Sequence, residues 1–266
     1  MSAIDQYYVI GNPVKHSLSP KIHQQFAEQT GQTLNYQTLE LSVDDFESEF
    51  QKLKDNPNVK GLSVTVPFKE QTFLLMDECD AHAKKAKAVS NVIFTKDRKA
   101  KGLNLDGIGF VQDLLNHQPI KDKNILVLGA GGAVKGCLDP LISQSPNSIT
   151  IANRTLSKAE ALQKIYQGIA DLKVTTYENI CDQYDLVINA TSASINQTML
   201  PISSTIFSEQ GFGYDLMYAP QGTVFTKWCQ KNNIPSIDGK GMLIELSAII
   251  FEMWRGVKPD TNQLVI

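Results

Sequence analysis

The sequence predicts an α/β protein of two domains, the second of them a doubly wound sheet. Three observations support this prediction. A short apolar run and a glycine cluster, at 124–136, lie where a strand pattern gives way to a helix pattern. Strand and helix patterns alternate on both sides of that cluster, as they do in βαβ units. The 266 residues, 42% of them hydrophobic, are enough for two domains with buried cores.

In the first half of the chain, Pro20 marks the start of a helix and Gly31 its end, because proline suits the first turn and glycine the residue after the last. A further helix begins at Asp106, after two short runs that flank a charged turn and predict a hairpin. The predicted strands lie at 7–10, 34–41, 62–66, 91–95 and 100–105, and the other helices at 43–54 and 69–76.

The second half repeats the alternation. Its further strands lie near Ile149, Val174, Leu186, Tyr214 and Ile234. Pro140 falls inside the first helix of this half, where we expect a kink or an early end. An apolar helix at 242–254 leaves this domain. We therefore divide the chain into 1–105, 106–240 and 241–266.

The glycine cluster is typical of a phosphate-binding turn. Gly129, Gly131 and Gly132 follow a buried, parallel-type strand, and glycines let the backbone approach a pyrophosphate at a helix N-terminus. The third position of the common fingerprint falls on Val134, so the alternative is a plain strand-to-helix turn.

Basic residues follow the next strand, where a protein that binds NAD usually has an acidic residue for the ribose hydroxyl. Arg154 stands there, and its planar charged fork suits a 2′-phosphate, so the sequence favours NADP. Lys158 adds a second charge. The alternative is a solvated surface arginine. The loop at 189–192 ends the strand near Leu186, where it would meet the nicotinamide half of the cofactor.

Candidate substrate and catalytic residues follow strands of the first half. Ser17 and Ser19 offer hydroxyl groups to an anion or a polyol just before a helix. Thr65 and Lys69 lie between a strand and a helix, where ligand sites gather in open α/β sheets. The alternatives are a helix cap for Ser19 and Asp106 and a solvated side chain for Lys69.

Composition argues against several classes of function. The net charge is −3 and the basic residues are dispersed, so we expect neither a nucleic-acid nor a membrane partner. The sequence has neither a secretory leader nor an apolar run of about 18 residues, and we expect a soluble, cytoplasmic protein. The cysteines lie far apart without a C-x-x-C pair, which predicts reduced thiols and no metal; they are Cys79, Cys137, Cys181 and Cys229.

Eight motifs in order resemble those of the shikimate dehydrogenase family, and the resemblance covers nearly the whole chain. Chance agreement across eight ordered motifs is negligible. The motifs are Ser17-Leu-Ser19-Pro20, Val64 to Lys69, Asn104-Leu-Asp106-Gly107, Gly129 to Ala133, Asn153 to Thr155, Asn189 to Ser192, Tyr214 to Tyr218 and Gly239 to Leu243.

The resemblance implies an N-terminal substrate domain, a Rossmann-like NADP domain with the active site in the cleft between them, and a last helix that packs back on the first domain. It implies reversible reduction of 3-dehydroshikimate to shikimate by NADPH. Lys69 and Asp106 would be the catalytic pair, because hydride addition to a ketone leaves an oxygen that needs a proton. The partner is a small-molecule substrate, and we expect a monomer or a homodimer.

The resemblance also assigns binding residues by position. The implied substrate-binding residues are Ser17, Ser19, Thr65, Ser90, Asn91 and Tyr218. The expected NADP-binding residues are Gly129, Ala130, Gly131, Gly132, Ala133, Asn153, Arg154, Thr155, Lys158, Thr191, Ser192, Gly239 and Met242.

Three places depart from the family pattern. Ser90 stands where the family has a substrate-binding asparagine, with Asn91 one residue later. Leu105 replaces a threonine and Leu246 a glutamine. Each change removes hydrogen-bonding reach near a polyol, so either Asn91 takes over the asparagine role or the substrate differs. The open alternatives are a quinate-active or otherwise altered paralogue, and a catalytically idle protein that binds NADP and senses a metabolite.

Overall fold

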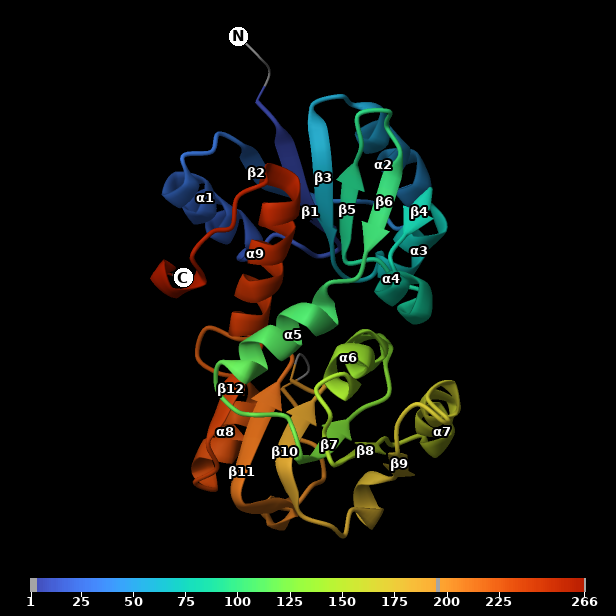
Figure 1. Ribbon diagram of the computed structural model, residues 1–266, viewed down its shortest axis with the longest axis vertical. Helices are drawn as coiled ribbons and strands as arrows, with labels where there is room; N and C mark the ends of the chain where they lie inside the picture. Colours follow the sequence, from blue (N-terminus) through green and yellow to red (C-terminus); the bar gives the residue numbers. More distant parts are fainter. Residues whose placement is uncertain (1–3, 195–196, 266) are drawn as a thin grey trace. The chain divides into compact units, whose positions relative to one another are not determined.

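The computed structural model describes residues 4–194 and 197–265, which fold as two compact units. Unit 1 combines Met1–Gly109 with Leu243–Ile266, and unit 2 comprises Phe110–Met242. Each unit contains its own sheet (Figure 1). Within the described ranges, none of the helices has the length and apolar character needed to span a bilayer.

The sheet of unit 1 has a parallel part and an antiparallel part. Its strands are β1 (Gln6–Gly11), β2 (Asn35–Glu40), β3 (Val59–Val64), β4 (Glu78–Cys79), β5 (Asn91–Phe94) and β6 (Ala100–Leu103). The strand order is β2-β1-β3-β5-β6-β4. β1 pairs in parallel with β2 and β3, and β5 pairs antiparallel with β3 and with β6, which forms the predicted hairpin.

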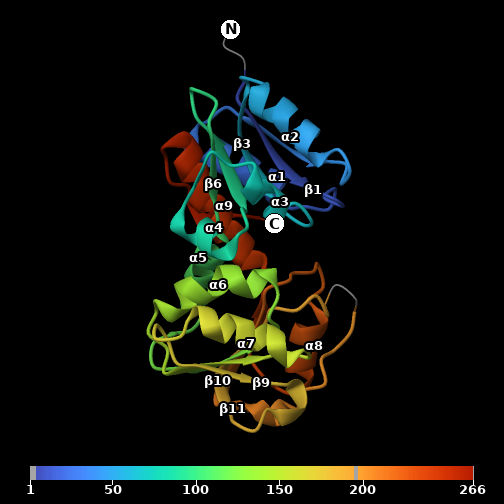
Figure 2. The same ribbon diagram turned by 90° about the vertical axis from the view of Figure 1, so that its right-hand side faces the viewer.

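Helices cover both faces of this sheet. They are α1 (Ser19–Thr30), α2 (Phe46–Asp55), α3 (Lys69–Leu74), α4 (Ala81–Ala86), the start of α5 (Asp106–Leu115), most of α9 (Lys240–Arg255) and a 3-10 helix at Thr261–Gln263. Successive residues of β1 point to opposite faces, as the period of a strand requires. Tyr8 and Ile10 pack with the residues of α2, whereas Tyr7 and Val9 pack toward Trp254 of α9. Figure 2 shows α2 and α9 on opposite sides of β3.

The packing of α9 against α1 closes the second face of unit 1. Phe251 and Ala248 of α9 are buried with Ile22 and Phe26 of α1. The rings of Phe26 and Phe251 meet edge to face, with centroids 5.6 Å apart. The core of unit 1 therefore includes residues from both ends of its sequence.

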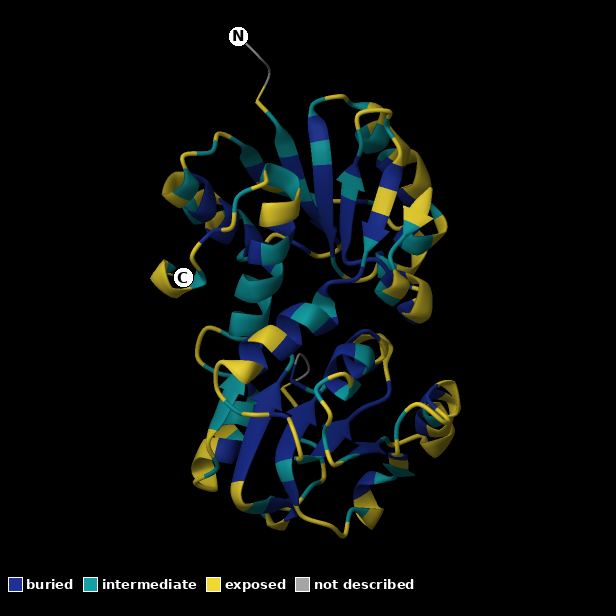
Figure 3. Cartoon of the chain, viewed as in Figure 1, coloured by how far each residue is buried: buried dark blue, intermediate teal, exposed yellow. Residues whose placement is uncertain are grey.

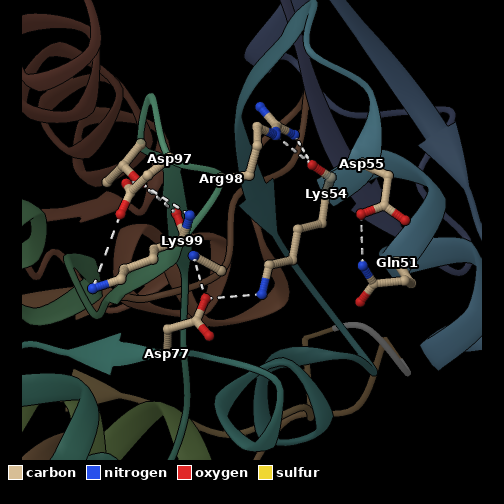
Figure 4. A network of polar contacts seen from close by, with 9 residues as sticks. Gln51, Lys54, Asp55, Asp77, Asp97, Arg98 and Lys99 are labelled. Atoms are coloured by element: carbon tan, nitrogen blue, oxygen red, sulfur yellow. Dashed lines mark hydrogen bonds and ion pairs between the residues drawn. The ribbon is translucent and has the colours of Figure 1, made fainter.

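Arg98 fastens the hairpin turn to the end of α2 (Figure 4). Its guanidinium donates hydrogen bonds to the carbonyl oxygens of Leu53 and Lys54, in the last turn of α2, and to that of Val59 at 2.9 Å. Carbonyl groups at a helix C-terminus otherwise lack partners inside the helix. Lys54 also forms an ion pair with Asp77 at 2.8 Å, and its hydrogen bond lowers the pKa of Asp77.

We expect Arg98→Met to lower the free energy of unfolding by about 1.5 to 3 kcal/mol, because the carbonyls of Leu53 and Lys54 lose a charged donor. Methionine keeps an unbranched side chain at the same left-handed backbone position, where φ is 62°. Urea unfolding measures the change. The matched control is Lys96→Met, in the exposed part of the same turn, which should change stability by less than about 0.5 kcal/mol. Equal losses in both variants would contradict a specific role for Arg98.

Every strand pairing that the structure describes in unit 2 is parallel. The strands are β7 (Asn124–Leu128), β8 (Ser148–Ala152), β9 (Leu172–Thr175), β10 (Tyr184–Asn189), β11 (Phe207–Asp215) and β12 (Ser236–Asp238). The helices are α6 (Gly132–Ile142), α7 (Leu156–Ile165) and α8 (Val224–Lys231), with 3-10 helices at Tyr177–Asn179 and Ser204–Ile206. The order β12-β11-β10-β7-β8-β9 is the doubly wound order, and it reverses between β7 and β10.

The strands of unit 2 are covered on both faces, which explains their continuous apolar runs. Ile125 and Val127 of β7 belong to a core with residues of α5, α6 and α7. Leu126 and Leu128 belong to a second core with Phe225 of α8. Figure 3 shows these strands as buried and the outer surface of α7 as exposed.

The structure confirms the α/β class with a doubly wound second sheet, and it refines several predicted elements. α6 continues through Pro140 and ends at Ile142, two residues later. Asp106 is the first residue of α5, as predicted. The short edge strand β4 was not predicted, and the last strand begins at Ser236 rather than near Ile234. These differences concern short elements, for which local patterns are weak.

Candidate functional site

Two loops of unit 1 meet at the carboxyl ends of β1 and β3. The strand order reverses between these strands, and ligand sites in open α/β sheets gather at such a point. The backbone N–H of Asn12 donates to the carbonyl of Val66 at 3.0 Å, and that of Thr65 donates to Ile10 at 2.9 Å. Gly11 permits this approach, because a Cβ there would run into the Thr65 side chain. The loop after β1, which leads to Ser17 and Ser19, therefore begins beside the segment that leads into α3.

Lys69 and Asp106 form an ion pair at the start of two helices. Lys69 is the first residue of α3, and Asp106 is the first residue of α5. Lys69 Nζ lies 2.6 Å from Asp106 Oδ2, a short charge-assisted hydrogen bond. The Lys69 side chain is 31% exposed and that of Asp106 is 13% exposed, so a ligand can reach the amine. The structure thus brings together the two residues predicted as a catalytic pair.

Hydroxyl groups cluster near the start of α1. Ser17 Oγ donates to Ser19 Oγ at 3.2 Å, and Ser19 is buried without capping the helix through its side chain. Tyr36 and Ser63 lie near them, although no motif marks either residue. Burial raises the pKa of Tyr36, and the Ser63 and Ser19 hydroxyls oppose this shift. The buried Tyr36 hydroxyl has no hydrogen-bond partner among the described residues, so the cluster is suited to receive a ligand oxygen.

Ser90 and Asn91, both predicted to bind substrate, form hydrogen bonds inside the protein. Asn91 is 0% exposed, and its amide donates to Ser63 Oγ at 3.1 Å. Ser90 Oγ donates to Asn91 Oδ1 at 2.9 Å and accepts from the N–H of Leu105 at 2.8 Å. Leu105 is buried, and Leu246 is partly buried on α9. We call the hydrogen-bonded residues Ser63, Asn91 and Ser90 the buried relay.

The glycine loop of unit 2 lies at the reversal point of its sheet, between β7 and β10. The N–H of Gly129 donates to the carbonyl of Ala152 at 2.8 Å, and its φ of 112° favours glycine. A Cβ at Gly129 would lie 3.1 Å from the carbonyl oxygen of Ala190. A Cβ at Gly131 or Gly132 would meet no atom within 4 Å. These two glycines therefore leave room for a ligand against the backbone.

The first turn of α6 is suited to a phosphate group. The helix begins at Gly132, and in its described residues it has neither a side-chain cap nor an acidic residue in the first turn. Its N-terminal N–H groups and the helix dipole favour an anion. Ala133 is exposed beside them, whereas Ala130 is buried in the core. The residues of this loop therefore fit the pyrophosphate of a dinucleotide.

The basic residues that favour NADP lie after β8. Arg154 and Lys158 are exposed, and β8 pairs with β7, so they follow the strand next to the glycine loop. Burial raises the pKa of Tyr177, and the charge of Arg154 is near enough to oppose that rise. Asn153 donates its amide to the carbonyl of Thr155 at 2.7 Å and so shapes the turn. An exposed guanidinium on this loop fits a 2′-phosphate.

Asp215 connects the loops that follow β10 and β11. Its buried carboxylate accepts from Ser194 Oγ at 2.7 Å and from the N–H of Met217 at 3.0 Å, and burial raises its pKa. Thr191 donates its hydroxyl to Asn189 Oδ1 at 2.8 Å. Tyr218, predicted to bind substrate, belongs to this unit and not to unit 1. The other predicted residues here are Ser192, which is exposed, Met242, which is partly buried, and Gly239, which is buried.

The described residues contain no group of three or more His, Cys, Asp and Glu side chains that could hold a metal ion. The cysteines are free thiols at Cys79, Cys137, Cys181 and Cys229. Burial raises the pKa of Cys229 to about 12, so its thiol stays protonated at neutral pH.

Models of known families match both halves of the chain. The shikimate dehydrogenase substrate binding domain matches residues 9–93, and shikimate / quinate 5-dehydrogenase matches residues 112–200. A protein of Hydrogenovibrio crunogenus named shikimate dehydrogenase (NADP(+)) is 42% identical over 269 residues, which cover 98% of this chain and 96% of that relative.

Solved structures have the same fold over nearly the full length. An Ael1 enzyme from Pseudomonas putida has a TM-score of 0.91 at 37% identity, covering 98% of each chain. Shikimate 5-dehydrogenase from Thermus thermophilus, in complex with NADP(H) and shikimate, has a TM-score of 0.87 at 27% identity, covering 97% of this chain and 96% of that one. Since the matches in sequence extend through both units, the chain belongs to the shikimate dehydrogenase family.

Proposed function

We propose that this protein reversibly reduces 3-dehydroshikimate to shikimate with NADPH. The ion pair of Lys69 and Asp106 carries the proposal, because reduction of a ketone needs a proton donor beside the carbonyl oxygen. The names of the relatives support the substrate and the cofactor. The presence of both members of the pair argues against an idle NADP-binding sensor. A cytoplasmic location and a monomeric or homodimeric state stay predictions.

The substrate would bind at the carboxyl ends of β1 and β3. The hydroxyls of Ser17, Ser19 and Tyr36 would donate to its carboxylate. NADPH, when bound, supplies the hydride that forms the new carbon–hydrogen bond. Lys69 donates a proton to the carbonyl oxygen, which becomes the hydroxyl of shikimate, and Asp106 orients the amine. In the reverse direction Lys69 takes that proton back.

Unit 2 would hold the cofactor. The turn at Gly129, Gly131 and Gly132 and the N-terminus of α6 would bind the pyrophosphate. Arg154, with Lys158 beside it on α7, would bind the 2′-phosphate and so select NADP over NAD.

A steady-state assay tests this function. Purified protein is supplied with shikimate or quinate, each with NADP or NAD, and we expect the highest kcat/KM for shikimate with NADP. A preference for quinate would indicate the altered paralogue. Absence of turnover with every pair, together with measurable binding of NADP, would contradict the enzyme assignment and favour a binding protein.

We expect Tyr36→Phe to raise the KM for shikimate about three- to tenfold, because one hydrogen bond to the substrate is lost. The kcat should change less, since the phenol takes no part in proton transfer. Steady-state kinetics with saturating NADP measures both. The control is Tyr8→Phe, whose hydroxyl donates to Gln6 of the same strand at 3.3 Å. An unchanged KM in Tyr36→Phe would remove this residue from the substrate site.

A further inference from the structure

The segment just before β5 contacts both members of the Lys69–Asp106 pair. The N–H of Val89 donates to the carbonyl oxygen of Lys69 at 2.9 Å. One residue later, Ser90 Oγ accepts from the N–H of Leu105 at 2.8 Å, and Leu105 directly precedes Asp106. Val89 and Ser90 therefore form hydrogen bonds with the backbone of Lys69 and with that of the residue before Asp106.

Asn91 fixes the direction of the Ser90 hydroxyl. A serine hydroxyl has a single hydrogen, and Ser90 has two acceptors for it, Asn91 Oδ1 at 2.9 Å and the carbonyl oxygen of Leu103 at 3.5 Å. The shorter of these hydrogen bonds is the one to Asn91. The oxygen lone pairs are then available to the N–H of Leu105. The other end of the Asn91 amide donates to Ser63 Oγ on β3 at 3.1 Å. The buried relay thus connects β3 to the start of α5.

The burial of the relay limits what it can do for a ligand. Asn91 is 0% exposed, Ser90 is 3% exposed and Ser63 is 8% exposed. If Asn91 turned its amide to a ligand, it would give up its hydrogen bonds with Ser63 and Ser90 in the interior, and the loss of hydrogen bonds between buried groups is costly.

We infer that Ser90 and Asn91 position the Lys69–Asp106 pair and do not bind the substrate themselves. This inference rests on the proposed function for its kinetic meaning. Where the family has a substrate-binding asparagine, this chain has a residue whose hydroxyl supports the backbone in front of Asp106. The specificity of the pocket is then set by groups other than Ser90 and Asn91.

Kinetics of the full-length protein separates positioning from binding. We expect Ser90→Ala to lower the kcat for shikimate oxidation about tenfold, because small displacements of a catalytic group reduce turnover, and to change the KM for shikimate less than about threefold. In Asn91→Leu the new side chain has nearly the same shape as asparagine, and this variant should also lower kcat while changing KM little. It replaces Ser90→Ala in the test if Ser90→Ala does not fold. The matched control is Thr72→Val on α3, which removes a buried hydroxyl with no hydrogen-bond partner among the described residues and should leave both constants unchanged.

A double-mutant cycle tests whether the effect passes through Asp106. In an Asp106→Asn background, Ser90→Ala should lower kcat by less than about threefold, because the charge that it positions is already absent. Equal effects in the two backgrounds would overturn the inference. A raised KM with unchanged kcat would overturn it too, since that result marks a direct substrate ligand.

Amide hydrogen exchange gives a measurement that does not depend on turnover. Ser90→Ala should speed exchange of the Leu105 N–H relative to wild type and to Thr72→Val, because its acceptor is lost. If wild-type protein does not oxidise shikimate, the proposed function fails, and this measurement alone decides the inference. Unchanged exchange at Leu105 in a folded Ser90→Ala variant would overturn it.

Discussion

Lys69→Ala is expected to lower the kcat for shikimate oxidation about 10²- to 10⁴-fold, with little change in the KM for NADP. The reason is that the amine of Lys69 would take the proton from the reacting hydroxyl, and general acid–base groups contribute about this much to rate. Asp106→Asn keeps the shape of the carboxylate but removes the charge that orients the amine. It should lower kcat as well. Both constants come from steady-state assays at the pH optimum of each variant.

The matched control for Lys69 is Lys101→Ala. Lys101 also pairs with a carboxylate in unit 1, that of Glu78 at 3.4 Å, but both of these side chains are exposed. They lie on strands β6 and β4, whereas Lys69 and Asp106 are the first residues of α3 and α5. The kcat of Lys101→Ala should match that of wild type. A loss below about tenfold in Lys69→Ala would indicate a solvated lysine and would remove the basis of the proposed proton transfer.

Arg154→Ala should raise the KM for NADP about 10- to 100-fold and leave that for NAD nearly unchanged. A charge-assisted contact with the 2′-phosphate is worth about 1.5 to 3 kcal/mol, and NAD has no phosphate at that position. The measurement is a pair of cofactor titrations with shikimate held saturating. The variant should therefore lose most of the preference for NADP over NAD.

A lysine on the helix that follows serves as the control for Arg154. Lys164→Ala removes an exposed charge from the far end of α7 and should leave both cofactor constants as in wild type. Equal losses with NADP and NAD in Arg154→Ala would mean that the arginine supports the fold of the loop and does not read the 2′-phosphate.

Local sequence patterns were sufficient to place the candidate residues on the right elements. Lys69 and Asp106 each begin a helix after a strand, and periodicity with turn residues marks such junctions. Their distance of 2.6 Å could not be predicted from those patterns, because it depends on how β3, β5 and β6 pair. The local pattern did not indicate that the two residues act together; the motifs of the family did.

The role of Tyr36 and the hydrogen bonds of the buried relay could not be predicted from the sequence. Tyr36 lies in a strand, where tyrosine commonly serves the core, so its unpaired hydroxyl has no signature in the sequence. The sequence makes Asn91 a candidate substrate ligand because it directly follows Ser90, where the family has a substrate-binding asparagine. In the structure its amide donates a hydrogen bond to Ser63 Oγ, and that contact follows from the pairing of these two residues between β3 and β5. Such cross-strand partners depend on register, which is a property of the assembled sheet.

The division of unit 1 between both ends of its sequence has a consequence for synthesis. Phe26 is made early, but its partner Phe251 emerges only after all of unit 2. At translation rates of about 5 to 20 residues per second, this delay is roughly 10 to 45 seconds. Throughout that interval the apolar side of α1 lacks its cover, whereas every core residue of unit 2 is made before Phe251. On the ribosome, the apolar side of α1 therefore stays uncovered until α9 is made, and transiently exposed apolar surface favours aggregation.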